Sequence, residues 1–114
     1  MNVEYIKICR LTEIAEGEGK RFQIDEENEA AVFKTGNDYY AVDNVCPHNH
    51  NPKIYKGDIE DNYVICPVHG YRFSLLNGEQ PDKSGCKLRI FEIKIENDFI
   101  YIKKPAGKKF DFHF

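Results

Sequence analysis

The sequence predicts an all-β fold, a sandwich or barrel built from short strands. Apolar and polar residues alternate in several short runs, which is the pattern of half-buried strands. Turn-forming Asn, Asp and Gly residues separate these runs at close intervals. No segment keeps a helical apolar period for longer than about two turns. The chain of 114 residues has the length of one domain, so we expect a single domain over residues 1–114.

The first half of the chain contains four runs of strand character. Residues 3–9 alternate and predict the first strand. Residues 11–20, with two glycines and several glutamates, predict a loop with at most one helical turn. Further strands are expected at residues 21–25, 30–34 and 39–43. The last two should form a hairpin, because the intervening segment Thr35-Gly36-Asn37-Asp38 has the composition of a turn.

The second half continues the same pattern with shorter runs. Strands are expected at residues 54–59, 63–65 and 71–75, with turns at Asp61-Asn62 and Asn77-Gly78. Residues 89–96 and 99–103 predict a final hairpin across Asn97-Asp98.

Charge and hydropathy argue against two classes of partner. The formal net charge is -3, whereas a phosphate-binding domain usually needs a basic patch. Four lysines near the C-terminus, Lys103, Lys104, Lys108 and Lys109, are typical of a solvated tail. No apolar run has the length of a membrane span, and residues 1–10 lack the features of a signal peptide. We therefore expect a cytoplasmic protein with no nucleic-acid and no membrane partner.

The four cysteines divide into two kinds. Two disulfides are conceivable, but without an export signal we expect reduced thiols. Cys46 and Cys66 each have a histidine close by in sequence, which is the spacing of metal ligands. Cys9 and Cys86 have no such partner and lie beside or inside strand-like runs. We expect both to be buried, inert thiols.

The chemically informative segments are Cys46-Pro47-His48 and Cys66-Pro67-Val68-His69-Gly70. Each follows a predicted strand directly, so the two can be neighbouring loops at one end of a sheet. Proline after each cysteine stiffens the loop and removes an N–H donor, and Gly70 permits a positive φ.

Two thiolates and two imidazoles can serve three kinds of site. Two loops can flank a two-iron cluster, with the cysteines on one iron and the histidines on the other, where neutral ligands ease reduction. A single zinc ion is an alternative, although zinc fingers usually pair cysteine with cysteine and histidine with histidine. A degenerate, empty site is the third possibility.

Here the sequence resembles the Rieske iron–sulfur domains. Cys-x-His, a gap of 17 residues and Cys-x-x-His match the signature of that family. Residues 69–73, 77–79 and 87–95 are similar to the soluble Rieske-type ferredoxins. The resemblance implies an antiparallel β-sandwich with a small cluster-binding subdomain at about residues 44–81, and a shielding loop around Pro81. It also implies one [2Fe-2S] cluster held by four ligands, Cys46, His48, Cys66 and His69.

Differences within the family bear on the redox potential. High-potential members have an extra cysteine in each loop, and a serine and a tyrosine two and four residues after the second ligand histidine. This chain has Val68 between Cys66 and His69, and Tyr71 and Phe73 in the two later positions. Fewer hydrogen-bond donors to sulfur stabilise the reduced cluster less, so we expect a potential of roughly -150 mV.

The first loop departs from the family pattern. Small residues and then Pro-Leu usually follow the first histidine, whereas residues 49–53 here are Asn-His-Asn-Pro-Lys. Asn and His tolerate a left-handed backbone better than most residues. We expect His50 to be an exposed loop residue near the cluster, and Ile54 to take the apolar place that Lys53 vacates.

The resemblance implies an electron carrier with no catalytic activity of its own. Its partners would be a flavin reductase as donor and an oxygenase as acceptor, docking briefly at an exposed tip that carries the ligand histidines. Alternatives are the small subunit of an NAD(P)H-dependent nitrite reductase and an iron–sulfur redox sensor. The C-terminal aromatic residues Phe110, Phe112 and Phe114 either pack on the body or a partner, or form a frayed end.

Overall fold

Three antiparallel sheets make up the protein in the computed structural model, which describes residues 4–47, 50–68, 70–82 and 85–104. The first sheet has the order β1 (Tyr5–Arg10), β10 (Phe99–Lys103), β9 (Ile93–Glu96). The second has the order β2 (Lys20–Gln23), β3 (Glu29–Thr35), β4 (Asp38–Asp43), β8 (Ile90–Phe91). The third has the order β5 (Asp58–Glu60), β6 (Tyr63–Ile65), β7 (Arg72–Ser74).

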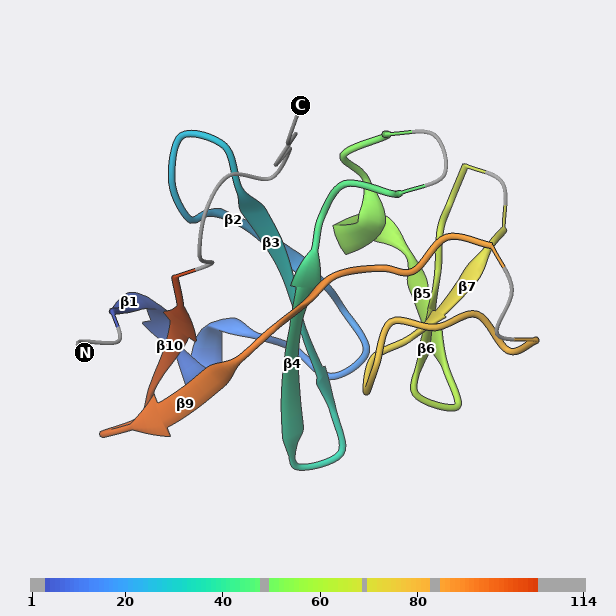
Figure 1. Ribbon diagram of the computed structural model, residues 1–114. Coiled ribbons are helices and arrows are strands. Elements are labelled where there is room, and N and C mark those ends of the chain that lie inside the picture. Colours follow the sequence, from blue (N-terminus) through green and yellow to red (C-terminus); the bar gives the residue numbers. More distant parts are fainter. Residues whose placement is uncertain (1–3, 48–49, 69, 83–84, 105–114) are drawn as a thin grey trace.

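These sheets follow one another across the molecule in Figure 1, with β2, β3 and β4 between the other two groups. Two short 3-10 helices, η1 (Leu11–Glu13) and η2 (Ile54–Lys56), are the helical elements of the described ranges, which contain no α-helix. The expected all-β, antiparallel class is confirmed. Within those same ranges, no helix has the length and apolar character needed to cross a membrane.

Strand β3, in the middle sheet, is buried on both of its faces. Its side chains alternate between two hydrophobic clusters, as the period of two in a strand requires. Ala30 and Val32 belong to the cluster shared with the first sheet, whereas Ala31 and Phe33 belong to the cluster shared with the third. All four are 0% exposed. A short run that is apolar at every position therefore indicates a strand between two cores.

Tight turns follow the residues that the sequence marks for them. Asp61, Asn62, Asn97 and Asp98 all have positive φ, between 50° and 66°. Both central residues of each pair are left-handed, which gives the sharp reversal of a two-residue hairpin loop. The strands expected at residues 63–65 and 99–103 are confirmed at those bounds as β6 and β10.

The expected strand over residues 54–59 is wrong in its first half, which is the helix η2. The backbone N–H of Ile54 bonds to the Asn44 carbonyl oxygen at 3.1 Å, and the N–H of Gly57 bonds to the Ile54 carbonyl oxygen at 2.9 Å. These partners take the backbone groups that a sheet ladder would use. The strand β5 begins only after Gly57, where the chain turns to pair with β6.

The single strand expected over residues 89–96 is in fact two strands in two sheets. β8 pairs with β4 through Val42 and Ile90, whereas β9 pairs with β10 through Ile102 and Ile93. The chain crosses from one sheet to the other at Glu92. Alternation alone could not show this, because the alternating pattern continues across Glu92 while the strand that pairs with the chain changes from β4 to β10.

A glycine in the connection after β7 gives a test of close packing. Gly78→Ala should lower the free energy of unfolding more than Gly36→Ala does. Both glycines have positive φ, +80° and +66°, so both alanines carry the left-handed strain of about 1–2 kcal/mol. A Cβ at Gly78 would also lie 1.8 Å from the Leu88 carbonyl oxygen, whereas one at Gly36 meets nothing within 4 Å. Urea unfolding of both variants measures the difference, and equal losses would contradict it.

Candidate functional site

Two loops carry the paired motifs, and they share one backbone arrangement. In the first loop, the Cys46 N–H bonds to the Asn51 carbonyl oxygen at 2.9 Å. The His50 N–H bonds back to the Cys46 carbonyl oxygen at 2.7 Å. His50 has a positive φ of 58°, as expected for this loop, and is exposed.

The second loop repeats these bonds at the same sequence spacing. The Cys66 N–H bonds to the Tyr71 carbonyl oxygen at 2.7 Å, and the Gly70 N–H bonds to the Cys66 carbonyl oxygen at 2.9 Å. Gly70 has a φ of 75° and so uses the left-handed conformation that the sequence indicated. Each cysteine therefore begins a turn of the same form, with a left-handed residue four positions later.

The structure brings both cysteines into one core. Cys46 and Cys66 are each 0% exposed and belong to the same hydrophobic cluster as Phe73 and Leu75. Their loops lie near each other at the upper right of Figure 1. His48 and His69, the other two predicted ligands, lie outside the described residues. In the part of the chain that is described, no group of three or more His, Cys, Asp or Glu side chains could hold a metal ion.

The unusual end of the first loop packs as the sequence predicted. Ile54 is 0% exposed and contacts the cluster that contains both cysteines, whereas Lys53 is exposed. One apolar residue thus replaces another, shifted by one position. Of the two residues that replace hydroxyl donors, Phe73 is 0% exposed within that cluster and Tyr71 is half-buried against it.

The two remaining cysteines differ from each other. Cys9 is 5% exposed in the opposite core, as expected, and burial together with nearby Glu13 raises the pKa of its thiol to about 11. Cys86 is only half-buried, so its expected burial is wrong. It lies in the irregular connection from β7 to β8, where the Gln80 side chain donates to its carbonyl oxygen at 3.2 Å. No disulfide joins any of the four cysteines.

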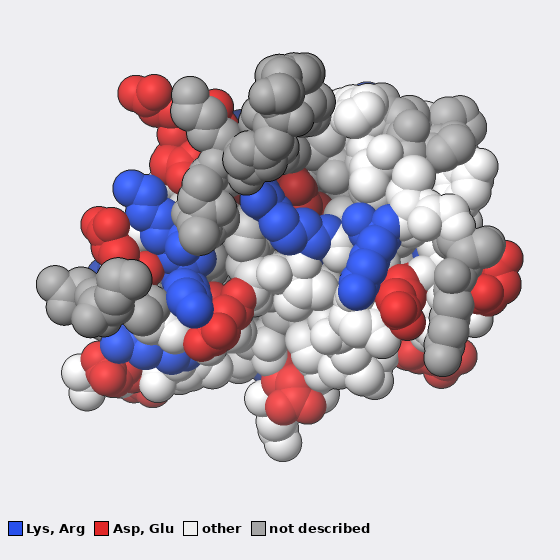
Figure 2. All heavy atoms as spheres, in the orientation of Figure 1, with Lys and Arg blue, Asp and Glu red and all other residues white. Residues whose placement is uncertain are grey.

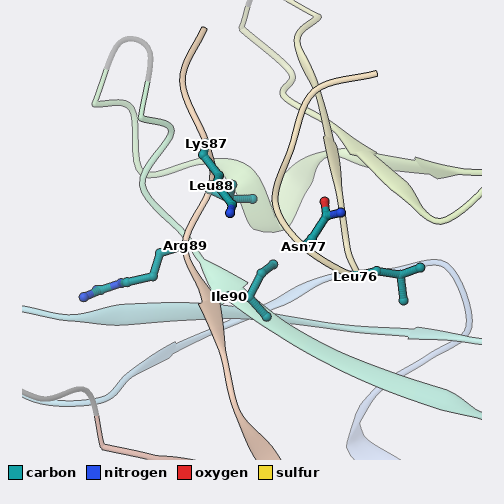
Figure 3. Close-up of a pocket in the computed structure, with 6 residues that line it drawn as sticks. All are labelled: Leu76, Asn77, Lys87, Leu88, Arg89 and Ile90. Carbon is teal, nitrogen blue, oxygen red and sulfur yellow. The ribbon is translucent and has the colours of Figure 1, made fainter. Parts of the chain in front are cut away.

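A hollow of about 470 Å³ lies apart from the cysteine loops (Figure 3). Residues of the connection after β7 and of the segment leading into β8 line it, and the described residues of the cysteine loops do not. In Figure 3 Arg89 points away from Leu76 and Asn77. The Arg89 guanidinium instead donates to the Asn28 side-chain oxygen and lies 3.5 Å from Asp43.

Asn44, which belongs to no motif of the sequence, is fully buried two residues before Cys46. Its side chain donates to the Pro52 carbonyl oxygen at 2.9 Å and accepts from the Tyr55 N–H at 2.8 Å. The available signal was an Asp-Asn pair directly after an apolar strand, where a core-facing polar residue needs partners.

The donor set fits a two-iron cluster as far as it is described. Two thiols, each at the start of an equivalent turn and both in one core, match a group that two loops flank. Such a cluster would take two cysteines on one iron and two histidines on the other.

Known proteins are similar to this chain in sequence and in fold. The family of Rieske-like [2Fe-2S] domains matches residues 4–103. The ferredoxin component of the alkene monooxygenase system of Xanthobacter autotrophicus is 27% identical over 95% of this chain and 88% of its own. The ferredoxin subunit of the 3-phenylpropionate/cinnamic acid dioxygenase of Escherichia coli is 30% identical over 90% of this chain and 96% of its own.

The fold comparison extends to a second kind of protein. A structure described as an NADH-dependent nitrite reductase small subunit from Mycobacterium tuberculosis superimposes with a TM-score of 0.85. It is 18% identical, and the match covers 94% of this chain and 100% of that one. At this identity the likeness shows the fold. The family match over residues 4–103, together with the paired cysteine loops, identifies the chain as a member of the Rieske-like [2Fe-2S] domain family, with a [2Fe-2S] cluster as its cofactor.

Proposed function

We propose that the chain is the ferredoxin of an oxygenase system, which takes single electrons from a flavin reductase and passes them to the oxygenase. The observation that carries this proposal is the pair of equivalent loops with fully buried cysteines, in a chain of the Rieske-like family. The relatives that are similar along almost their whole length are ferredoxin components of oxygenase systems. The chain acts as a carrier, and catalysis belongs to its partners.

The proposed ligands are Cys46 and Cys66 on one iron and His48 and His69 on the other. When bound, such a cluster supplies a centre that accepts and releases one electron. Burial of both cysteines excludes water from the thiolates. The matched turns fix the orientation of each cysteine, because its backbone N–H and its carbonyl oxygen each make one of the two bonds of the turn. Residues 44–81, which contain both loops and the third sheet, form the proposed cluster-binding subdomain.

This subdomain shares its core with the middle sheet. Phe33 and Val42 of that sheet lie in one cluster with Cys46, Cys66 and Phe73. The shared core would therefore hold the loops in place when a partner binds to them. A rigid site favours fast electron transfer because little rearrangement accompanies a change of charge.

The proposed docking surface is the tip formed by the loops. Pro67, Val68 and Gly70 are exposed and uncharged, and Val68 is 39% exposed. On the side seen in Figure 2, acidic and basic groups interleave at the left, whereas much of the upper right is uncharged. An exposed apolar residue within a small uncharged surface suits a brief contact between redox partners.

Two other functions remain testable alternatives. If the chain is a nitrite reductase small subunit, a large flavin- and sirohaem-containing protein should co-purify with it. If it is a redox sensor, its affinity for a partner should change between the oxidised and reduced protein. Stable isolation without such a subunit, and equal affinity in both redox states, would favour the carrier.

The ligand assignment predicts distinct outcomes for the four cysteines. Purified wild-type protein should be red-brown and contain iron and acid-labile sulfide, whereas a zinc protein would be colourless. Cys46→Ser and Cys66→Ser should lose most of the visible absorption, because each removes one thiolate from the set.

Cys9→Ser and Cys86→Ser are the controls for these variants. They should keep the visible and EPR spectra of the wild type, although a hydroxyl in the Cys9 site should lower the stability of the core. Loss of the cluster in either control would show that the ligand assignment is wrong.

The potential should lie in the low part of the Rieske range, roughly -150 mV. Phe73, which has no hydroxyl group, lies in the core with the cysteines and cannot donate a hydrogen bond to sulfur. A redox titration followed by EPR measures the midpoint, and a value above about +100 mV would contradict the assignment. His69→Cys should retain some cluster and lower the potential, because a thiolate adds negative charge where an imidazole is neutral.

A further inference from the structure

Asn44 lies at the start of the first cysteine loop with every polar group bonded. Its backbone N–H bonds to the Glu29 carbonyl oxygen, and its carbonyl oxygen accepts from the Ile54 N–H, both at 3.1 Å. Its side-chain amide donates to Glu29 Oε1 at 2.8 Å and to the Pro52 carbonyl oxygen at 2.9 Å. Its side-chain oxygen accepts from the Tyr55 N–H at 2.8 Å. The residue is 0% exposed.

These bonds join the two ends of the loop. The chain leaves β4 at Asn44, passes Cys46 and returns at residues 52–55, where three of the five bonds are made. A single buried residue thus closes the segment that supplies the first cysteine and the first histidine of the motif, with two bonds from its side chain and one from its backbone carbonyl oxygen. Buried hydrogen bonds of this kind hold a loop in one conformation, because breaking them leaves buried polar groups with neither a protein partner nor water.

The second loop is closed in a different way. It lies between β6 and β7, which pair directly beside it through Ile65 and Arg72. The first loop has a strand, β4, on one side only, because η2 follows on the other side. No ladder therefore spans its base, and the bonds of Asn44 take the place that the ladder has in the second loop.

Glu29 connects this closure to the middle sheet. One of its carboxylate oxygens, Oε1, accepts both from Asn44 and from Arg21 Nε, each at 2.8 Å. Its side chain is 18% exposed, whereas that of Arg21 is 44% exposed. The arginine at the surface thus balances the charge of a carboxylate that holds a buried amide. Loop, β3 and β2 are joined in one chain of hydrogen bonds.

We propose that Asn44 is a positioning residue for the [2Fe-2S] cluster, with Glu29 as its support. Its amide holds the first loop in the conformation that presents Cys46 beside Cys66. An asparagine is required because the site needs two donors and one acceptor on a planar group. This proposal rests on the ligand assignment of the proposed function.

Asn44→Asp tests the proposal with almost no change in size. The carboxylate loses both donors and faces the Glu29 carboxylate and the Pro52 carbonyl oxygen, so acceptors would meet acceptors. Chelator-driven loss of the visible absorption should become about tenfold faster than in the wild type, the usual scale for lost support of a metal ligand. The EPR lines should broaden and the midpoint potential should shift, because the ligand loop samples several conformations.

Glu29→Gln is the milder second variant. It keeps an acceptor for the Asn44 amide but loses the charge, so its rate of cluster loss should lie between those of the wild type and Asn44→Asp. This variant remains informative if Asn44→Asp fails to fold.

Asn28→Ala is the matched control, because Asn28 is also a buried asparagine at 1% exposure. Its side chain bonds to Asp25 and Arg89 and makes no direct bond to the described residues of the first loop. It should lower the unfolding temperature yet leave the EPR spectrum and the rate of cluster loss close to those of the wild type. If this control loses the cluster as fast as Asn44→Asp, or if Asn44→Asp and Glu29→Gln both match the wild type, the proposal is wrong.

Hydrogen exchange separates this proposal from the proposed function. In the protein as isolated, Asn44→Asp should speed exchange in peptides that cover residues 44–55, and leave residues 63–74 unchanged. That result would support the closure of the loop even if the purified protein held zinc instead of a two-iron cluster. Unchanged exchange in residues 44–55 would overturn it even if the cluster and its spectrum were as proposed.

Discussion

Burial of strand β3 on both of its faces is the constraint on which the remaining structure depends. Val32 on one face and Phe33 on the other each remove a whole side chain from water, worth roughly 1.5–3 kcal/mol apiece. The strand that carries them is therefore fixed from two sides. Cys46 and Cys66 pack in the same cluster as Phe33, so the cysteine loops are held against this strand. The hydrophobic effect thus brings the two thiols into the core, but apolar contacts have no direction and do not set the orientation of the thiols.

The geometry comes from hydrogen bonds, and the two loops obtain it by different means. Each cysteine makes the same two backbone bonds, so the turns themselves are equivalent. Their bases are not, since paired strands close one and a buried asparagine closes the other. A strand ladder spreads its strength over several residues, whereas a single amide concentrates it in one. The first loop should therefore be more sensitive to a single substitution than the second.

The positions that the sequence predicted well are those governed by local rules. Turns at Asp61-Asn62 and Asn97-Asp98 follow from the tolerance of these residues for positive φ. The strands β6 and β10 follow from alternation and from those turns. The sequence placed Ile54 in the core because the neighbouring Lys53 is charged and cannot fill an apolar site. The left-handed Gly70 was likewise indicated by residue type, whereas for the first loop residue type indicated only that its Asn and His residues tolerate such a backbone, which His50 adopts.

By itself the sequence determined the fold class, the hairpin turns and the paired cysteine motifs, because each depends on residues that are close together in the chain. Only the tertiary structure decided the rest. In that structure Ile90 and Ile93 lie in different sheets, Ile54 begins a short helix and Cys86 is half-buried. It also gave Asn44 its role, since the partners Glu29 and Tyr55 lie 15 and 11 residues away. A hydrogen bond between distant segments has no local signature, because its partner is chosen only when the chain has packed.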